Sequence, residues 1–418
     1  MRIVLALIAV FSIGARADVT LPAILTDHMV IQRNLPVHIW GKAAPGEPVA
    51  VTFRGEAKST AADTIGRWSV YLAPAEAGGP HEITIKGANT VTLRDVLVGD
   101  VWVGSGQSNM DWTVARSVNG QAEVASAKYP NIRLFTVAKV VSDYPLDDVG
   151  SKGWTACSPE TVPNFSAVAY YFGRHLNQQL NVPVGLIHSA WGGTPVDAWT
   201  SLGAISEDAS LMPVFSDWAR MTGGHAAAMA RYQLQLRDWE AASAQAKAEG
   251  KAEPRKPGAP NGPGGPWTPA GLYNSMIAPL TPFPIKGAIW YQGESNASPR
   301  RSPIYARLFQ TIIRDWRQAW GVGDFPFFFV QLANFKTSPE STWPELREAQ
   351  LDTLALNNTG MAVTIDIGNP ADIHPTNKQD VGLRLALAAR AVAFGEKIEY
   401  SGPLFRQATQ EGGVLRVW

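Results

Sequence analysis

The pattern of apolar residues changes near residue 96, and this change limits the possible folds more than any other feature of the chain. From residue 18 to 96, short segments alternate apolar and polar residues between turn residues, as in 36–41, 49–53 and 81–85. Such alternation predicts antiparallel strands. From residue 97 to 398, compact apolar runs alternate with segments of helical period, which is typical of βαβ units. We therefore expect a small all-β domain, similar to a β-sandwich, in front of a larger α/β domain.

The α/β part is expected to form a doubly wound parallel sheet. Five apolar runs predict strands at 97–103, 184–188, 287–291, 325–332 and 361–367. Segments of helical period predict helices at 165–180, 303–320, 344–356 and 379–394. A parallel sheet with helices on both faces is the most economical architecture, because helical crossovers place successive strands side by side.

Two segments interrupt this regular pattern. An insertion at about 206–268 begins with an alanine-rich, charged stretch that we expect to be helical. It continues with 254–266, which is too rich in proline and glycine for a helix. The insertion either covers a functional site or elaborates the surface, and the pattern slightly favours the surface. Residues 399–418 begin another β-like pattern that stops within an apolar run, which suggests the start of a truncated C-terminal β domain.

The N-terminus has the features of an export signal. Arg2 precedes the apolar run 3–13, and residues 15–17 form an A-x-A cleavage motif. A signal peptide is therefore expected at 1–17, which places the mature protein in the periplasm or outside the cell. A membrane anchor is disfavoured because the run is far shorter than the ~20 residues that cross a bilayer. No other segment is long and apolar enough to span one.

The charge balance argues against several classes of partner. The chain has 36 basic and 36 acidic side chains, so no surface-wide field favours nucleic acid or an anionic membrane. A neutral substrate fits this balance better. The 15 tryptophans are available for stacking on sugar rings, although most tryptophans fill cores. Cys157 is the single cysteine, which excludes a disulfide framework. The composition leaves the oligomeric state open.

Polar residues cluster at the ends of four predicted strands. Ligands bind at the carboxyl ends of the strands in an open parallel sheet, so these clusters are expected to meet at one edge. They are 104–110 with Ser108, 189–194 with Gly193, 292–296 with Gln292, Glu294 and Asn296, and 372–375 with Asp372 and His374. Each cluster alone is weak evidence, but four of them at one sheet edge indicate a functional site.

These residue types suit acyl transfer. A serine hydroxyl becomes a good nucleophile when an imidazole takes its proton, a carboxylate fixes the tautomer of that imidazole, and N–H donors hold the oxyanion. We therefore predict Ser108 as the nucleophile and His374 as its base, with Asp372 as the nearby acid. His188 is the one rival base, but its nearest carboxylate in the following sequence is Asp197.

Other chemistries do not fit the spacing of the residues. The chain has no H-E-x-x-H motif, no histidine pair at ligand spacing and no cysteine cluster, so neither a metal nor another cofactor is expected. It lacks a P-loop, and Met110 stands where the G-x-S-x-G elbow would need glycine. A glycosidase with two carboxylates, one of them Glu294, would leave Ser108 and His374 unexplained.

Taken together, the four clusters resemble the sialate O-acetylesterase family, a branch of the SGNH hydrolases related to acetylxylan esterases. The likeness covers nearly the whole mature chain, including the β region and the insertion. It is carried by Gly-Gln-Ser-Asn-Met at 106–110, Trp-Gly-Gly-Thr at 191–194, Trp-Tyr-Gln-Gly-Glu-Ser-Asn at 290–296 and Asp-Ile-His-Pro at 372–375. The resemblance implies the flavodoxin-like SGNH-hydrolase fold, and members of the family commonly carry a further β domain after the catalytic one.

The resemblance also implies roles for individual residues. Ser108 would be the nucleophile and His374 the base. The oxyanion donors would be the Ser108 N–H, the Gly193 N–H and the Gln292 side chain, with support from Asn109, Glu294 and Asn296. SGNH enzymes usually place the acid three residues before the histidine, where this chain has Ala371. The acid is therefore open between Asp372 and Asp366.

The activity implied by the resemblance is that of a secreted carbohydrate O-acetylesterase acting on O-acetylated sugars or glycans without a cofactor. A second possibility keeps the same site for acetylxylan or another hemicellulose ester. A third, of a different class, is a non-catalytic sugar-binding protein, which the tryptophan content and the β region would suit.

Overall fold

The computed structural model describes residues 18–418, so the signal peptide expected at 1–17 lies outside the described residues. Strand β7 (Thr90–Gly106) connects the two parts of the fold. Its first half pairs antiparallel with β6 (Gly78–Lys86), and its second half pairs parallel with β10 (Val184–Ala190) and β11 (Gly287–Tyr291). The boundary expected near residue 96 therefore lies inside one continuous strand.

The central sheet has the order β13-β12-β11-β7-β10-β8-β9, and all neighbours are parallel except β8 and β9. The strands not yet named are β8 (Tyr129–Thr136), β9 (Trp154–Cys157), β12 (Phe327–Val330) and β13 (Thr359–Ala362). This arrangement confirms the predicted α/β class. The sequence did not reveal β8, which contains a proline and an arginine, or β9, which has only four residues.

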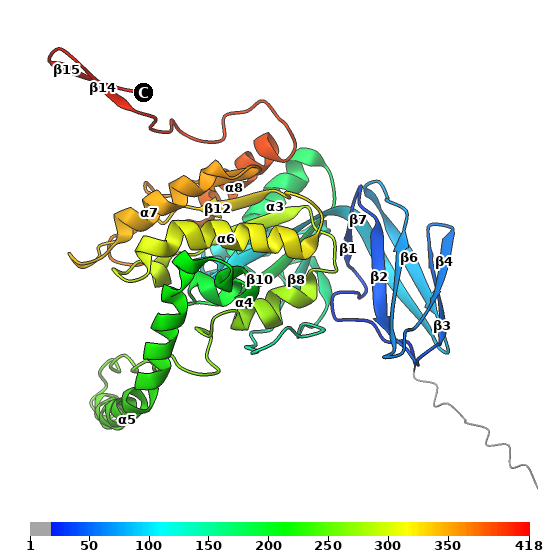
Figure 1. Ribbon diagram of the computed structural model, residues 1–418, viewed down its shortest axis with the longest axis horizontal. Coiled ribbons are helices and arrows are strands. Elements are labelled where there is room, and N and C mark those ends of the chain that lie inside the picture. The colour runs from blue at the N-terminus through cyan, green and yellow to red at the C-terminus, as the bar shows by residue number, and fades with distance from the viewer. Residues whose placement is uncertain (1–17) are drawn as a thin grey trace, which may run out of the picture.

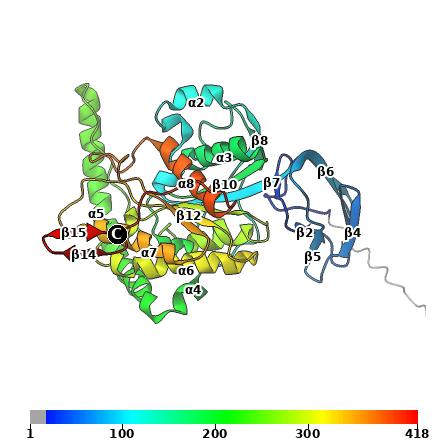
Figure 2. The same ribbon diagram turned by 90° about the horizontal axis from the view of Figure 1, so that it is seen from above.

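Helices cover both faces of this sheet, and alternate side chains of β12 show which face is which. Phe328 lies against Trp102 on the face that carries α3 (Ala167–Leu180) and α8 (Lys378–Val392), whereas Phe327 and Phe329 contact Phe309 of α6 (Ser302–Trp320). Figure 2 shows α3 and α8 on one side of the sheet and α6 on the other. The remaining helices are α1 (Ser108–Asp111), α2 (Gly120–Ser126), α4 (Leu202–Ser206), α5 (Pro213–Ala248) and α7 (Trp343–Asp352).

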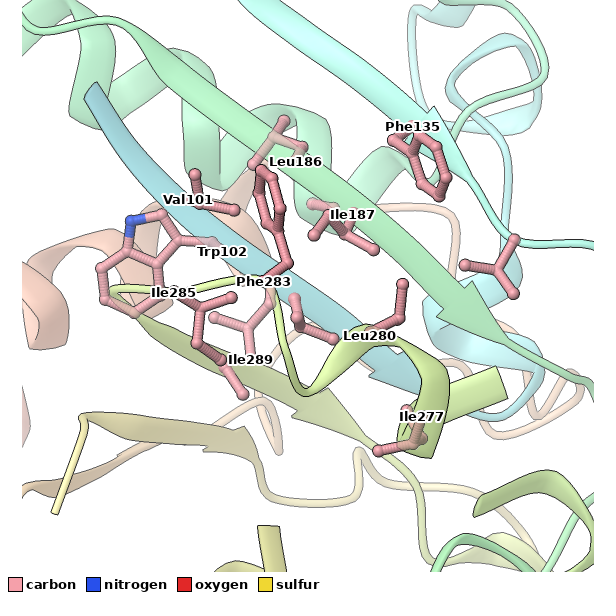
Figure 3. Close-up of a cluster of buried hydrophobic side chains, with 14 of the residues drawn as sticks. Val101, Trp102, Phe135, Leu186, Ile187, Ile277, Leu280, Phe283, Ile285 and Ile289 are labelled. Carbon is pink, nitrogen blue, oxygen red and sulfur yellow. The ribbon is translucent and has the colours of Figure 1, made fainter. Parts of the chain in front are cut away.

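A dense apolar core fixes the strands relative to one another. Side chains of β7, β10 and β11 meet those of residues 277–285, which lead into β11 (Figure 3). Val101, Trp102, Leu186 and Ile289 are all fully or almost fully buried. Burying one such side chain contributes about 1.5–3 kcal/mol, so this core holds the strand ends rigidly.

The strands before β7 lie in layers at one end of the molecule (Figure 1), and β1 and β6 join them to the central sheet by pairing with β7. β2 pairs antiparallel with β5, and β3 pairs with β4 and β6. Alternate residues of β2 and β5 are buried, as the alternating sequence predicts. The strands are β1 (Val30–Gln32), β2 (Val37–Lys42), β3 (Pro48–Phe53), β4 (Glu56–Ala61) and β5 (Arg67–Leu72), together with β6.

The insertion contains a long helix followed by a loop, as expected. Helix α5 projects from the body of the molecule in Figure 1, and the following loop folds back along it, where the Trp239 indole donates to the Pro254 carbonyl at 2.8 Å. Most of this segment is surface structure. Its last residues reach the carboxyl ends of the central strands, because the Trp267 indole donates to the Gly193 carbonyl at 2.7 Å.

The last described residues form an exposed hairpin of β14 (Ala408–Glu411) and β15 (Val414–Val417). Within residues 18–418, every helix is too short or too polar to cross a bilayer.

Candidate active site

Ser108 lies at the carboxyl end of the central strand β7. Gly106 has a φ of +133°, and a Cβ at this position would lie 2.2 Å from the Tyr291 carbonyl oxygen, so only glycine fits. The next N–H, from Gln107, donates to the same carbonyl at 2.9 Å. This tight approach of two neighbouring strands turns the chain so that Ser108 begins the short helix α1.

The structure brings Ser108 and His374 together, although they are 266 positions apart in the chain. The His374 Nε2 atom lies 2.9 Å from the Ser108 Oγ, which is hydrogen-bond distance. The Trp112 ring stacks on the imidazole with centroids 5.5 Å apart and fixes its plane. Burial lowers the pKa of His374 below its ordinary value, more than the Asp372 carboxylate raises it. The imidazole is therefore neutral near pH 7 and able to accept the serine proton.

Of the two candidate acids, only Asp372 lies near His374. The Asp372 Oδ1 atom is 3.4 Å from His374 Nδ1 and also accepts the His374 backbone N–H at 2.9 Å. Its side chain is half exposed, so water screens its charge. Asp366 instead binds the Arg384 guanidinium with both oxygens, at 2.6 and 2.7 Å. The structure thus directs Asp366 away from the imidazole.

The loop after β10 packs directly against the nucleophile. A Cβ on Gly192 would lie 3.3 Å from the Ser108 Cβ, and Gly193 has a φ of +75°, which favours glycine. The Trp191 N–H donates to the Gly106 carbonyl at 3.1 Å and ties this loop to β7. Within residues 18–418, the N–H groups of Ser108 and Gly193 donate to no other group. Both are available to a ligand oxygen at this site.

The Gln292 side chain lies at the expected sheet edge, but its amide, expected to donate to an oxyanion, instead binds other groups of the protein. Its amide nitrogen donates to the Thr194 carbonyl at 3.2 Å and to Asn296 Oδ1 at 2.7 Å, so both of its hydrogens are used. Its Oε1 accepts the Tyr305 hydroxyl at 3.0 Å. Asn296 Oδ1 also accepts the Val196 N–H at 3.1 Å. Gln292 and Asn296 therefore brace the end of β11 against residues 194–196.

A buried polar network that the sequence did not reveal joins the nucleophile helix to the histidine segment. The Asn109 amide donates to Glu294 Oε1 at 2.6 Å and to the Ile373 carbonyl at 3.0 Å, directly before His374. The Lys378 ammonium donates to Asn109 Oδ1, and Lys378 is fully buried. The only sequence signal was a cation in the first turn of a helix, where the helix dipole disfavours it.

Burial shifts the pKa of both ionisable groups of this network toward their neutral forms. The pKa of Lys378 falls to about 7, and that of Glu294 rises, in each case chiefly because the charged form loses water. The attraction between the two groups opposes both shifts. The Asn109 side chain therefore links Lys378 to Glu294, two groups whose charged forms are destabilised by burial, and it also binds the Ile373 carbonyl.

His188, the rival base, does not reach Ser108. Its ring is buried, and burial lowers its pKa to about 4. Its nearest carboxylate is Asp111, at 3.5 Å, which is already paired with Lys139. The positions of these residues along the chain did not predict this contact. Asp197 pairs with Arg301 at 2.8 Å. His188 is thus a neutral, buried histidine packed on the edge of Phe165.

The described part of the chain contains no group of three His, Cys, Asp or Glu side chains arranged to hold a metal ion. Burial raises the pKa of the Cys157 thiol to about 12, which leaves it unreactive near neutral pH. The arrangement that remains is a hydroxyl against a neutral imidazole, with two free N–H groups beside it. This arrangement is suited to acyl transfer from an ester.

Comparisons with known proteins agree with this chemistry. Residues 264–393 match the family model described as carbohydrate esterase, sialic acid-specific acetylesterase. The sialate O-acetylesterase of Mus musculus is 34% identical in an alignment that covers 96% of this chain and 79% of that protein. The Homo sapiens sialate O-acetylesterase is 32% identical over 91% of this chain and 72% of that protein.

A solved structure is similar over the same span. The crystal structure of a carbohydrate acetylesterase from Xanthomonas citri has a TM-score of 0.79 and 39% sequence identity. The match covers 96% of this chain and 81% of that chain.

Proposed function

This chain belongs to the sialate O-acetylesterase family and is an esterase, and we propose that it removes acetyl groups from sugars by a Ser–His–Asp acyl-enzyme mechanism. The observation that carries the mechanism is the 2.9 Å contact between His374 Nε2 and Ser108 Oγ. Neither a buried structural serine nor a sugar-binding surface needs a neutral imidazole at this distance. The contact therefore favours catalysis over binding alone.

We assign each step of the proposed reaction to a group near Ser108. The Ser108 Oγ attacks the acetyl carbonyl carbon while its proton passes to His374 Nε2. The N–H groups of Ser108 and Gly193 hold the resulting oxyanion, and Asp372 stabilises the imidazolium. The carbon–oxygen bond to the sugar then breaks, and the sugar oxygen takes the proton from Nε2. Water, activated by the same imidazole, releases acetate from Ser108.

Three further features belong to the proposal. The strand order, with helices on both faces, supports the doubly wound SGNH-hydrolase fold. The sequence of residues 1–17 supports export to the periplasm or the cell exterior. The substrate is an O-acetylated sugar, with acetylated sialic acid ahead of acetylxylan because of the relatives named above.

The test of the activity is acetate release from a panel of acetylated sialic acid, acetylxylan and acetylated manno-oligosaccharide. We expect acetate from at least one sugar ester, and a Ser108 peptide that carries one acetyl group after rapid acid quenching. An enzyme that releases acetate while its acetyl group is found on another residue would contradict the mechanism. Sugar binding without any acetate release would favour a non-catalytic protein.

Replacing Asp372 with asparagine distinguishes the two candidate acids. The rate follows the fraction of neutral His374, so kcat/KM falls as the pH drops through the lowered pKa of that residue, below 6.5. Asp372 raises this pKa, so its loss moves the acid limb to lower pH. Because Asp372 is half exposed, kcat/KM at neutral pH should fall only about 10- to 100-fold, less than the ~10⁴ seen for a buried acid.

The matched control is Asp366→Asn, which breaks the pair with Arg384 and leaves the imidazole untouched. It should shift neither the acid limb nor the plateau of a pH–rate profile. A larger effect from Asp366→Asn than from Asp372→Asn would reassign the acid.

A further inference from the structure

A cleft separate from Ser108 and His374 lies where the N-terminal strands meet the α/β domain. It has a volume of about 540 Å³, which is within the ordinary range of ligand sites. One wall is the outer face of the β2–β5 pair, and the other is formed by residues 146–148 and 278–282. The lining of this cleft includes neither Ser108 nor any other residue at the carboxyl end of β7.

Aromatic rings line the outer face of β2–β5, where a surface strand pair usually carries polar side chains. The His38 ring stacks on Tyr71 with centroids 4.1 Å apart and planes 5° apart, and on Trp40 at 4.8 Å. His38 and Tyr71 are directly opposite in the strand register. The His38 Nδ1–H donates to the Pro282 carbonyl at 2.8 Å, which fixes the stack to the opposite wall.

The outer end of this stack is open. Tyr71 is 56% exposed, although its ring is held in place by His38. A rigid, exposed ring loses little conformational freedom when a ligand covers it. The apolar face of a sugar ring packs well on such a surface, while the sugar hydroxyls need polar groups beside it. Ser69, two residues before Tyr71, lies on the same face and supplies a hydroxyl.

The charges of the cleft disfavour an acidic ligand. Lys42 and Arg67 both bind Asp147, at 3.1 and 2.8 Å. Asp148 accepts the Ala23 N–H with both oxygens, and Asp63 accepts two N–H groups of its own turn. The two cations are thus already paired, and the three carboxylates outnumber them. Among the described residues that line the cleft, a sialate or phosphate group would meet no free cation, whereas a neutral sugar carries no charge that needs one.

We propose that this cleft is a second binding site, for a neutral oligosaccharide, with Tyr71 as its stacking platform. The site would hold one part of a glycan chain while an acetyl group elsewhere on that chain reaches Ser108. This role rests on the proposed esterase function, but binding in the cleft does not depend on Ser108.

The test measures binding to Ser108→Ala protein, so that hydrolysis cannot interfere. Xylohexaose, mannohexaose and lacto-N-tetraose serve as neutral probes, and sialyllactose as the acidic one, by isothermal titration. We expect saturable binding of at least one neutral probe, weakened at least about tenfold by Tyr71→Ala and retained in Tyr71→Phe, which keeps the ring. In the enzyme that retains Ser108, Tyr71→Ala should raise KM for acetylated polysaccharide and leave kcat/KM on p-nitrophenyl acetate unchanged.

Tyr144→Ala is the matched control, because Tyr144 is 69% exposed and lies outside the cleft lining. It should leave oligosaccharide affinity unchanged. The proposal is overturned if no neutral probe shows saturable binding, or if Tyr71→Ala and Tyr144→Ala have the same oligosaccharide affinity. It is also overturned if Tyr71→Ala converts a dimer to monomers, because this face would then be a contact between two copies. Loss of hydrolysis in Ser108→Ala with intact binding would support both sites separately, and intact hydrolysis would reject only the esterase mechanism.

Discussion

Replacing Ser108 with alanine is expected to lower kcat on an acetyl ester by about 10⁴- to 10⁶-fold, the range for serine hydrolases that lose their nucleophile. In the proposed mechanism the hydroxyl oxygen bonds to the acetyl group, and His374 Nε2, 2.9 Å from it, accepts its proton. Residual rate would come from the N–H groups of Ser108 and Gly193, which the substitution leaves in place. The measurement is steady-state release of p-nitrophenol from p-nitrophenyl acetate, with the initial burst followed by stopped flow.

Ser105, three residues earlier and within strand β7, offers a matched control. Its side chain is fully buried, and its hydroxyl has no hydrogen-bond partner within residues 18–418. Ser105→Ala removes this unsatisfied group, so stability should stay equal or rise slightly, and the rate should stay close to that of the unchanged chain. Equal losses in Ser105→Ala and Ser108→Ala would mean that the segment, and not the nucleophile, was damaged.

The sequence predicts the groups at the strand ends well because local pattern determines them. Glycine-rich turns after apolar strands place Ser108 and Gly193, and the rule that parallel strands share a carboxyl edge brings His374 to them. The same rule cannot tell which atoms of a side chain remain free. Gln292 lies at the expected edge, yet its amide is used by Thr194 and Asn296, which only the folded loop places beside it.

Contacts between segments that are distant in the chain could not be predicted from the sequence. Asp111 meets His188 and Lys139 because β10, α1 and the segment after β8 converge, and nothing in their order along the chain indicates this. Strand β9 has four residues and takes its register from β8. Lys378 is the clearest case, because a lysine at a helix start is expected at the surface and this one is fully buried.

Replacing Lys378 with methionine is expected to lower the free energy of unfolding by about 3–5 kcal/mol, because it removes the ammonium that donates to Asn109 Oδ1 and attracts the buried Glu294 carboxylate. Glu294→Gln alone should also destabilise the fold, since it leaves a buried ammonium. The double variant should return to within about 1–2 kcal/mol of the unchanged chain, because the raised pKa of Glu294 and the lowered pKa of Lys378 both show that burial penalises the charged forms. Urea unfolding of the unchanged chain, the two single variants and the double variant completes this double-mutant cycle.

The same variants separate a positioning role of Lys378 from a purely structural one. The charged groups that face His374 are Asp372, which raises its pKa, and Lys378 and Arg116, which lower it. Without the Lys378 cation the pKa of His374 rises, so the acid limb of kcat/KM moves to higher pH in both Lys378→Met and the stable double variant. Lys397→Met, on an exposed lysine, should change stability by no more than about 0.5 kcal/mol and leave the limb in place.

An unchanged acid limb in the stable double variant would show that Lys378 serves the fold alone. A shifted limb would show that the Asn109 network sets the proton affinity of the base as well as its place. The network reaches His374 by two routes, the Lys378 charge and the hydrogen bond from Asn109 to the Ile373 carbonyl. Because Asn109 directly follows Ser108, its side chain then links the position of the nucleophile to the pKa of His374.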